Sequence, residues 1–393
     1  MNYFVDSNGV LQPGPPARPQ QCLTLPNLER TLHSLRLGGR FVFEAEICGA
    51  RFVLYRFRRD GGGSYRVAVR VQKQWPAGMQ PEAIQNVVRR EVCVLQKLES
   101  VRFQYAPKCV AFCLSFDNPI RQPFLVLEWV AGQPLVWTKD HPAMDLRIRV
   151  LTQLFQLQQE LIDKSLESRD KTAKQFYMQL IHDKIMGAPR GPPGMGGMPT
   201  QEDYWGQLTQ LDAILGPNQG DRTYAVAHNN LVAENIIVDS NYNIKCIVGW
   251  SYGGIYPLGQ TATLPRLFTH NTGNGSAEAC MMAERLFNDK IQYRHPLHLH
   301  NVTLTPARQA MMQWQNAQDA ELRALYMQSM QHSDVLAWLA RHGWRIPRLR
   351  AYHDVPMLPG LMTQPRRGSL YGTREEEAEP FEDELDCKAE PST

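Results

Sequence analysis

The segment that most constrains this fold is residues 224–258, with the sequence YAVAHNNLVAENIIVDSNYNIKCIVGWSYGGIYPL. Three short apolar runs within it, at 224–227, 236–238 and 244–248, have the residue types of β-strands. The polar stretch HNNLVAEN separates the first two runs, and a turn over 239–243 separates the last two. This pattern predicts a strand, a polar loop and a β-hairpin, which bring the side chains of the loop and of the hairpin to one place.

The chain has 393 residues, which is enough for two lobes around this segment. Residues 36–130 show the alternation of a small antiparallel sheet, interrupted at 82–98 by apolar residues with helical spacing. A DGGG sequence at 60–63 is a hairpin signal between two of the strands. The five expected strands are 40–47, 51–58, 65–71, 110–116 and 124–130.

After residue 131 the pattern becomes mostly helical. Thr200 is followed by acidic residues in the first turn of a helix, which is typical of a helix N-terminus. Residues 187–199, GAPRGPPGMGGMP, contain too much glycine and proline for a helix or a strand and are expected to form a loop. The expected helices are 147–165, 204–215, 277–290, 306–330 and 333–342.

We therefore predict an α+β protein of four parts. Residues 1–35 form a flexible N-terminal arm, and 36–130 form an N-lobe with a small antiparallel sheet and one helix. Residues 131–360 form a larger, mainly helical C-lobe that contains the hairpin segment, and 361–393 form a disordered acidic tail.

Charge is distributed unevenly along the chain. Residues 374–393 hold nine acidic and two basic side chains, a net charge of −7, so the rest carries about +10 against a total of +3. A basic body suits a ligand that carries phosphate, but a solvated surface with an acidic tail explains the same numbers. The eight cysteines form no CxxC pair, and no apolar run approaches the length of a membrane span. We expect reduced cysteines, a cytoplasmic location, and no binding to nucleic acid or to membranes.

Four motifs, in order, resemble the aminoglycoside phosphotransferase and choline kinase superfamily over roughly residues 40–350, most closely its fungal phosphotransferase branch. The segment FLVLEWVAGQPL resembles the family's hinge, which implies that Glu128, Trp129 and Val130 receive the adenine of ATP. Arg70 stands where the third strand of the family supplies a cation to the phosphates, and Glu91 resembles the helix glutamate that holds this cation. The resemblance implies a bilobal, protein-kinase-like fold with ATP and magnesium as cofactors.

The fourth motif, HNNLVAEN followed by IVGW, resembles the family's catalytic and metal loops but departs from them at two positions. Asn230 replaces the aspartate that acts as base, and an amide cannot take up a proton. Gly249 replaces the aspartate that binds magnesium, and glycine offers no side-chain oxygen. His228 and Asn235 are retained. These substitutions predict a pseudokinase that keeps a cleft for a nucleotide or small molecule, or for a protein partner, without ordinary phosphoryl transfer.

Two alternatives remain open at this stage. One is an active ATP-dependent phosphotransferase that binds the metal through Glu234 and Asn235. The other is a pocket that catalyses a different reaction on a metabolite, with His228, Glu234 or Tyr252 as acid or base.

Overall fold

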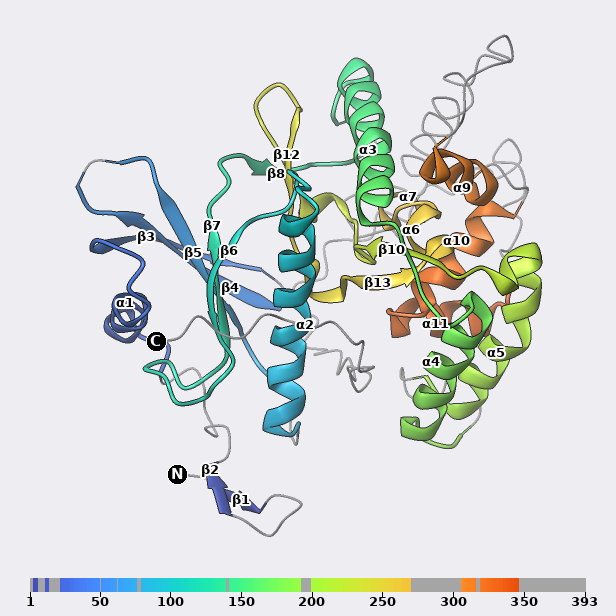
Figure 1. Cartoon of the computed structure of the whole chain (residues 1–393), viewed down its shortest axis with the longest axis horizontal. Coiled ribbons are helices and arrows are strands. Elements are labelled where there is room, and N and C mark those ends of the chain that lie inside the picture. Colours follow the sequence, from blue (N-terminus) through green and yellow to red (C-terminus); the bar gives the residue numbers. More distant parts are fainter. Residues whose placement is uncertain are drawn as a thin grey trace, which may run out of the picture.

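The computed structural model describes residues 3–5, 11–13, 22–49, 51–61, 63–75, 79–138, 141–191, 199–269, 305–315 and 319–345 (Figure 1). The expected helix at 277–290 and the acidic tail at 361–393 lie outside the described residues. The same holds for residues 1–2, 6–10 and 14–21 of the N-terminal arm and for residues 192–198 of the loop at 187–199.

Five antiparallel strands form the N-lobe sheet in the order β3-β4-β5-β7-β6, and all five had been predicted. Alternation explains the sheet: in β4, buried Val53, Tyr55 and Phe57 alternate with half-buried Leu54 and Arg56. The strands are β3 (Phe41–Cys48), β4 (Phe52–Arg59), β5 (Arg66–Gln72), β6 (Cys109–Cys113) and β7 (Phe124–Glu128).

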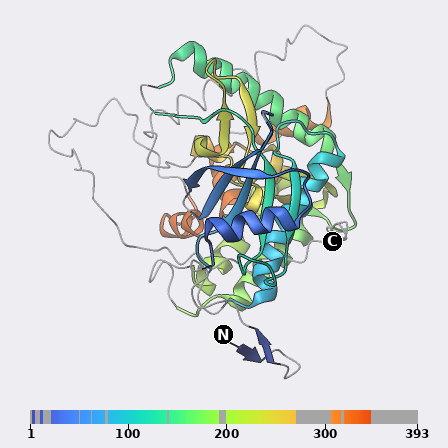
Figure 2. The ribbon, with the colours of Figure 1, turned by 90° about the vertical axis from the view of Figure 1, so that its left-hand side faces the viewer.

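Each face of this sheet is covered by one helix. Helix α1 (Leu25–Ser34) buries Leu28 and Leu32 against the face that carries Val67 and Val69, and Figure 2 shows α1 lying across the sheet. Helix α2 (Pro81–Ser100) lies between the sheet and the C-lobe (Figure 1). The region 1–35 was predicted to be a flexible arm, which is wrong for α1. Two short paired strands, β1 (Tyr3–Val5) and β2 (Leu11–Pro13), also lie in this region.

The described part of the C-lobe is mainly helical, which confirms the predicted α+β fold class. The predicted N-terminus of α5 is confirmed, since Thr200 and Asp203 form a capping box. The stretch expected as one helix at 306–330 forms two, α9 and α10, and α4 was not predicted. The helices are α3 (Met144–Ser165), α4 (Ala173–Gly187), α5 (Gln201–Leu215), α6 (Leu258–Ala262), α7 (Arg266–Thr269), α9 (Pro306–Gln315), α10 (Ala320–Ser329) and α11 (Ser333–Arg341).

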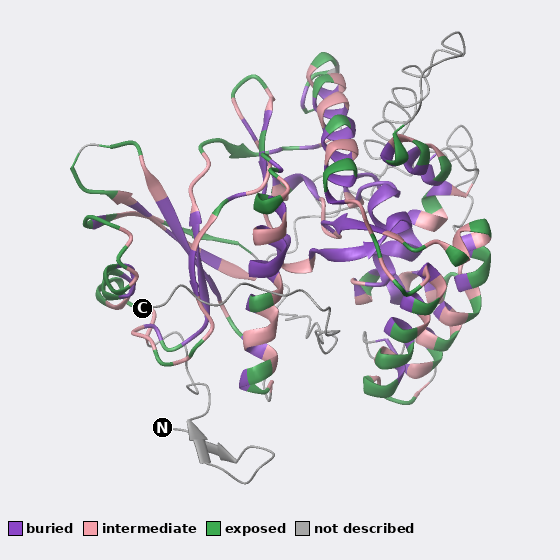
Figure 3. Ribbon diagram, viewed as in Figure 1, coloured by how far each residue is buried: buried purple, intermediate pink, exposed green. Residues whose placement is uncertain are grey.

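The three strands expected in residues 224–258 are present, as β10 (Thr223–Ala227), β11 (Ile236–Val238) and β12 (Ile244–Ile247). They belong to two small sheets, because β10 pairs with β9 (Glu167–Ser168) and β13 (Gly254–Pro257), while β11 pairs with β12 and β8 (Gln133–Pro134). The core of β10 is fully buried, and Figure 3 shows β10 and β13, found by their place in Figure 1, in the middle of the C-lobe. This buried position fixes the polar loop between β10 and β11.

The connection between the lobes passes close to the hairpin. Gly132 has a φ of +155°, and a Cβ added there would lie 2.6 Å from Cγ2 of Ile237 and 2.8 Å from the carbonyl oxygen of Val238. Only glycine allows this close approach, which places the hinge end of β7 beside β11.

The structure also bears on the expected membrane spans and on the expected state of the cysteines. None of the helices in the described ranges is long and apolar enough to cross a membrane. The cysteines at 22, 48, 109, 113 and 246 are free, but Cys93 on α2 is disulfide-bonded, so the expectation of reduced cysteines throughout is wrong at this residue.

Candidate functional site

His228, the first residue after β10, is locked in place by its surroundings. Its Nδ1 accepts a hydrogen bond from the backbone N–H of Asn230 at 3.2 Å, so its Nε2 donates to the carbonyl oxygen of Val248 at 2.9 Å. The ring packs edge-on against buried Trp250, with 4.5 Å between the ring centroids. Burial lowers the pKa of His228 to about 4. The imidazole is therefore neutral near pH 7 and acts as a brace between the loop and the hairpin.

Asn230, where the resemblance expects a base, is held by a cation. Its Oδ1 accepts a hydrogen bond from Nη1 of Arg266 at 2.8 Å. The same guanidinium bonds Nδ1 of His332 at 2.9 Å and pairs through Nη2 with Asp334 at 3.1 Å. His332 in turn contacts the carbonyl oxygen of Asn229 at 2.8 Å. The position that would need a proton acceptor thus holds a neutral amide, fixed by residues from α7 and from the start of α11.

Asn235, in the short η4 helix (Ala233–Asn235), is turned toward the loop. Its Nδ2 donates to the carbonyl oxygen of Asn230 at 2.8 Å, and its own carbonyl accepts from the N–H of Val248 at 2.9 Å. These bonds join the loop directly to β12 and its following residues. The Nδ2 group and the backbone carbonyl of Asn235 therefore stabilise the loop, while its Oδ1 lies beside Gly249.

Gly249 has a left-handed backbone, with φ of +81°, and lies directly against Asn235. A Cβ added at this glycine would lie 2.7 Å from Oδ1 and 2.9 Å from Cγ of Asn235. Any larger residue would have to displace the Asn235 side chain from its bond to Asn230, and would also adopt a backbone conformation that L-residues disfavour. The position lacks a carboxylate and, as folded, lacks the room for one.

The residues around this loop do not fit a magnesium ion. Glu234, the proposed substitute ligand, is exposed to solvent. Across the described ranges, no three His, Cys, Asp or Glu side chains lie close enough together to hold a metal ion. Magnesium needs several oxygen ligands in a nearly ideal octahedron, and one asparagine oxygen does not supply them.

In the N-lobe, the structure brings together Arg70 on β5 and Glu91 on α2. The two side chains form a buried ion pair through Nη1 of Arg70. The guanidinium also lies 3.4 Å from the centre of the Phe52 ring. Nη2 of Arg70 is buried and has no hydrogen-bond partner in the described structure. A buried cationic donor of this kind suits an anionic acceptor.

A row of stacked cations and rings continues from Arg70 into the C-lobe. The Arg51 guanidinium lies 5.6 Å from the Phe52 ring centre and 5.0 Å from that of Tyr252. Tyr252, in η5 (Trp250–Tyr252), packs against His332 with 4.8 Å between ring centroids. The β3–β4 turn thereby contacts the residues that surround the Asn230 loop.

The hinge residues mostly serve the sheet. The N–H of Glu128 donates to the carbonyl oxygen of Lys108 at 2.9 Å, and the N–H of Trp129 donates to that of Arg66 at 3.0 Å. The Glu128 carboxylate is 39% exposed and lies 3.9 Å from Nζ of Lys108. Neither N–H is available to a nucleotide base, and Val130, which follows them, is half-buried.

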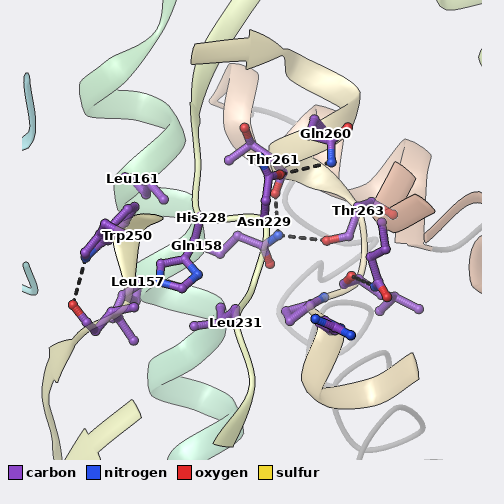
Figure 4. Close-up of a pocket in the computed structure, with 15 residues that line it drawn as sticks. Leu157, Gln158, Leu161, His228, Asn229, Leu231, Trp250, Gln260, Thr261 and Thr263 are labelled. Carbon is purple, nitrogen blue, oxygen red and sulfur yellow. Dashed lines mark hydrogen bonds between the residues drawn. The ribbon is translucent and has the colours of Figure 1, made fainter. Parts of the chain in front are cut away.

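A small cavity of about 60 Å³ lies behind the loop, with His228, Asn229 and Gln260 at its wall (Figure 4). Asn229 has a φ of +60°, and its side chain donates to the carbonyl oxygen of Tyr252 at 2.9 Å and accepts from Gln260 at 3.0 Å. The cavity has room for a few water molecules and is too small for a nucleotide.

Sequence reasoning identified His228, Asn230, Asn235, Arg70 and Glu91, and missed the residues that surround them. Arg266 lies 36 positions after Asn230, and His332 lies 66 positions after Arg266. No motif spacing connects these residues. Arg51 lies at the turn between β3 and β4, outside the motifs that carry the resemblance.

No protein-family model matches the chain, and no curated protein matches it by sequence. Several solved structures are similar to it at low sequence identity. An aminoglycoside phosphotransferase of Streptomyces rimosus, solved with ADP and streptomycin, is 17% identical with a TM-score of 0.45, over 80% of this chain and 98% of that one. A putative aminoglycoside phosphotransferase of Ralstonia eutropha is 12% identical with a TM-score of 0.44, over 81% and 98% of the two chains.

An ethanolamine kinase of Plasmodium vivax is 11% identical with a TM-score of 0.44, over 79% of this chain and 78% of that one. Similarity at this level carries no information on the activity or the ligand of the present chain. We therefore infer both from the residues of this chain alone.

Proposed function

We propose that this chain is a kinase-like pseudoenzyme of the aminoglycoside phosphotransferase and choline kinase type. It does not transfer phosphate by the magnesium-dependent route. Between its lobes it binds a small anionic ligand, such as a nucleotide, through arginine side chains and without a metal ion.

The observation that carries the proposal is the contact between Asn235 and Gly249. With 2.7 Å between a Cβ at residue 249 and Oδ1 of Asn235, the folded loop offers no room for a metal-binding carboxylate at this residue. The base position is also occupied, since Arg266 donates to the Asn230 amide. Losing a general base alone typically lowers the rate by about 10²–10⁴. Losing the metal ligand as well removes the charge stabilisation on which phosphoryl transfer depends.

The retained anion site rests on the N-lobe. Arg70 is 7% exposed, and its Nη2 is buried without a partner in the described structure. The Glu91 carboxylate neutralises this guanidinium, and the Phe52 ring packs against it. Arg51 adds a second guanidinium nearby, stacked between the rings of Phe52 and Tyr252. Two arginines can hold phosphate oxygens without a bridging metal.

The alternative, an active phosphotransferase that uses Glu234 and Asn235, has weaker support. Glu234 is exposed, and no three His, Cys, Asp or Glu side chains of the described ranges lie close enough together to hold a metal ion. No contact of the described residues favours the third reading, a different reaction on a metabolite, because the buried His228 has a pKa of about 4 and both its ring nitrogens are bonded.

The test is a turnover assay of the full chain with ATP and magnesium, in the presence and absence of small hydroxyl and amine acceptors. We expect ADP formation no faster than in a sample without protein, and no difference between the wild type and Asn235→Ala. Magnesium-dependent turnover that Asn235→Ala abolishes would overturn the proposal.

A further inference from the structure

The N-lobe carries a patch of three arginines, and the single carboxylate among them does not neutralise their charge. Glu44, in the irregular part of β3, contacts Arg58 at 3.3 Å, Arg56 at 3.1 Å and Arg66 at 2.9 Å. We call these four residues, together with Trp129, the arginine face. The hydrogen bond from Arg66 lowers the pKa of Glu44, which therefore stays ionised. One negative charge among three positive charges leaves the arginine face at +2.

These arginines remain accessible despite their contacts. The side chains of Arg56, Arg58 and Arg66 are 30%, 36% and 36% exposed. The Arg56 guanidinium lies 5.0 Å from the ring centre of half-buried Trp129, so an aromatic surface borders the cations. A surface with several cations and one aromatic side chain suits an acidic peptide that contains an aromatic residue.

The surrounding strands strengthen the positive potential. Residues 36–73 contain nine basic side chains and three acidic ones, a net charge of +6. At physiological salt the screening length is about 8 Å, so charges on neighbouring strands act together on a bound carboxylate.

The chain itself contains a segment of the matching chemistry. Residues 375–386, EEEAEPFEDELD, hold eight acidic side chains, no basic one, and the aromatic residue Phe381. The segment begins 30 positions after Arg345, the last described residue. An extended connection of this length reaches up to roughly 100 Å. A folded body of about 300 residues has a radius of gyration of roughly 19 Å, so every part of its surface is within reach.

We propose that the acidic segment 375–386 docks on the arginine face of its own N-lobe. Its carboxylates pair with Arg56, Arg58 and Arg66 and Phe381 packs beside Trp129. Intramolecular attachment raises the effective concentration of the segment to the millimolar range, so weak surface pairs are sufficient. This contact does not depend on whether the protein has kinase activity.

The test uses the full chain with the photocrosslinking amino acid benzoylphenylalanine in place of Phe381, irradiated and mapped by mass spectrometry. We expect crosslinks within the same molecule to β3, β4, β5 or the residues around Trp129. Raising the salt from 0.1 to 0.5 M should lower their yield several-fold, because the pairs are exposed.

Two variants separate docking from chance contact. Changing the eight acidic residues of 375–386 to their amides should lower the yield roughly ten-fold, since each lost surface pair weakens the contact. Arg56→Gln with Arg58→Gln should lower it roughly five-fold, and it leaves Glu44 paired with Arg66. The control Arg121→Gln removes an exposed arginine elsewhere in the N-lobe and should change nothing.

Three outcomes would overturn the proposal. They are crosslinks on the C-lobe, crosslinks between two copies of the chain, and a yield that the amide variant leaves unchanged. The amide variant alters no residue of the described structure, so its result stands even where an arginine variant folds poorly.

Discussion

The two lobes differ at the positions where the resemblance implies phosphate binding and phosphate transfer. In the N-lobe, Arg70 and Glu91 form the buried pair that the sequence predicts. In the C-lobe, Asn230 and Gly249 stand where the resemblance expects a base and a metal ligand; Arg266 donates to Asn230, and Asn235 lies against Gly249. We infer from this comparison that the N-lobe keeps the side chains that hold an anion, whereas the C-lobe loop lacks the carboxylates that a base and a metal ion would need.

The largest effect is expected from breaking the N-lobe pair. Glu91→Gln leaves Arg70 as a buried cation without its counter-charge, which should cost about 3–5 kcal/mol of unfolding free energy. Urea denaturation monitored by circular dichroism measures this loss. The double variant Arg70→Met with Glu91→Leu should be less destabilised than Glu91→Gln, because no charge remains buried. A loss below about 1 kcal/mol for Glu91→Gln would show that the pair is solvated.

A loss of stability at acidic pH should follow from the brace at His228. Its pKa is about 4 when folded and about 6.5 in the unfolded chain, so only the unfolded state binds a proton between these values. The titration of His228 should not change the free energy of unfolding above pH 7. It should lower this free energy by roughly 3 kcal/mol as the pH drops from 6.5 to 4.

Denaturation curves at several pH values, for the wild type and for His228→Gln, measure this contribution. The variant should lose most of the pH dependence in this window. His342→Gln, at an exposed histidine, is the control and should keep it. A wild-type curve that is flat between pH 4 and 6.5 would contradict a buried neutral imidazole.

Restoring the metal carboxylate should destabilise the protein and should not activate it. Gly249→Asp forces an L-residue into a left-handed conformation and into contact with Asn235, at a cost of about 2–3 kcal/mol. Gly61→Asp is the matched control, because Gly61 has a φ of +99° and open space around it. The control should lose about 1 kcal/mol.

The contact itself is isolated by a double-mutant cycle. Asn235→Gly should recover part of the loss in the Gly249→Asp background, since it removes the side chain that the new Cβ meets. If Gly249→Asp and Gly61→Asp cost the same, the Asn235 contact has no energetic weight.

The smallest change in the free energy of unfolding is expected for a substitution at Asn230. Asn230→Asp places a carboxylate beside Arg266, which should raise the stability at pH 7 by about 0.5–1 kcal/mol. The pairing depresses the pKa of the new carboxyl, so the gain should be lost as the pH falls below about 4. Thermal unfolding at pH 7 and at pH 3 gives the comparison. Phosphate transfer by this variant would mean that Arg266 does not hold the side chain.

Residue types and their alternation were sufficient to predict the N-lobe sheet and the strands of the hairpin segment. Helix α1 was missed because proline, glycine and glutamine dominate the residues before it, although Leu28 and Leu32 are fully buried. Helix α4 was not predicted, although its buried residues follow helical spacing and form one stripe: Ala173, Phe176, Tyr177, Leu180, Ile181 and Ile185.

The candidate site was predictable only in part. The sequence shows that residue 249 has no side chain, but only the folded backbone shows that Asn235 fills the space beside it. Arg266 and His332 come from elements far along the chain, and their contacts to the Asn230 loop depend on tertiary packing. Motif spacing locates such positions, but it does not report what occupies the space around them.

The most direct test of the central claim is a calorimetric titration of ATP into the full chain, once with magnesium and once with EDTA. Because residue 249 offers no carboxylate and the described ranges hold no group of three metal-binding side chains, we expect dissociation constants that agree within about two-fold in the two conditions. Binding strengthened about ten-fold or more by magnesium would show that a metal site exists and would contradict the account. The absence of binding in both conditions would contradict the anion site assigned to Arg70 and Arg51.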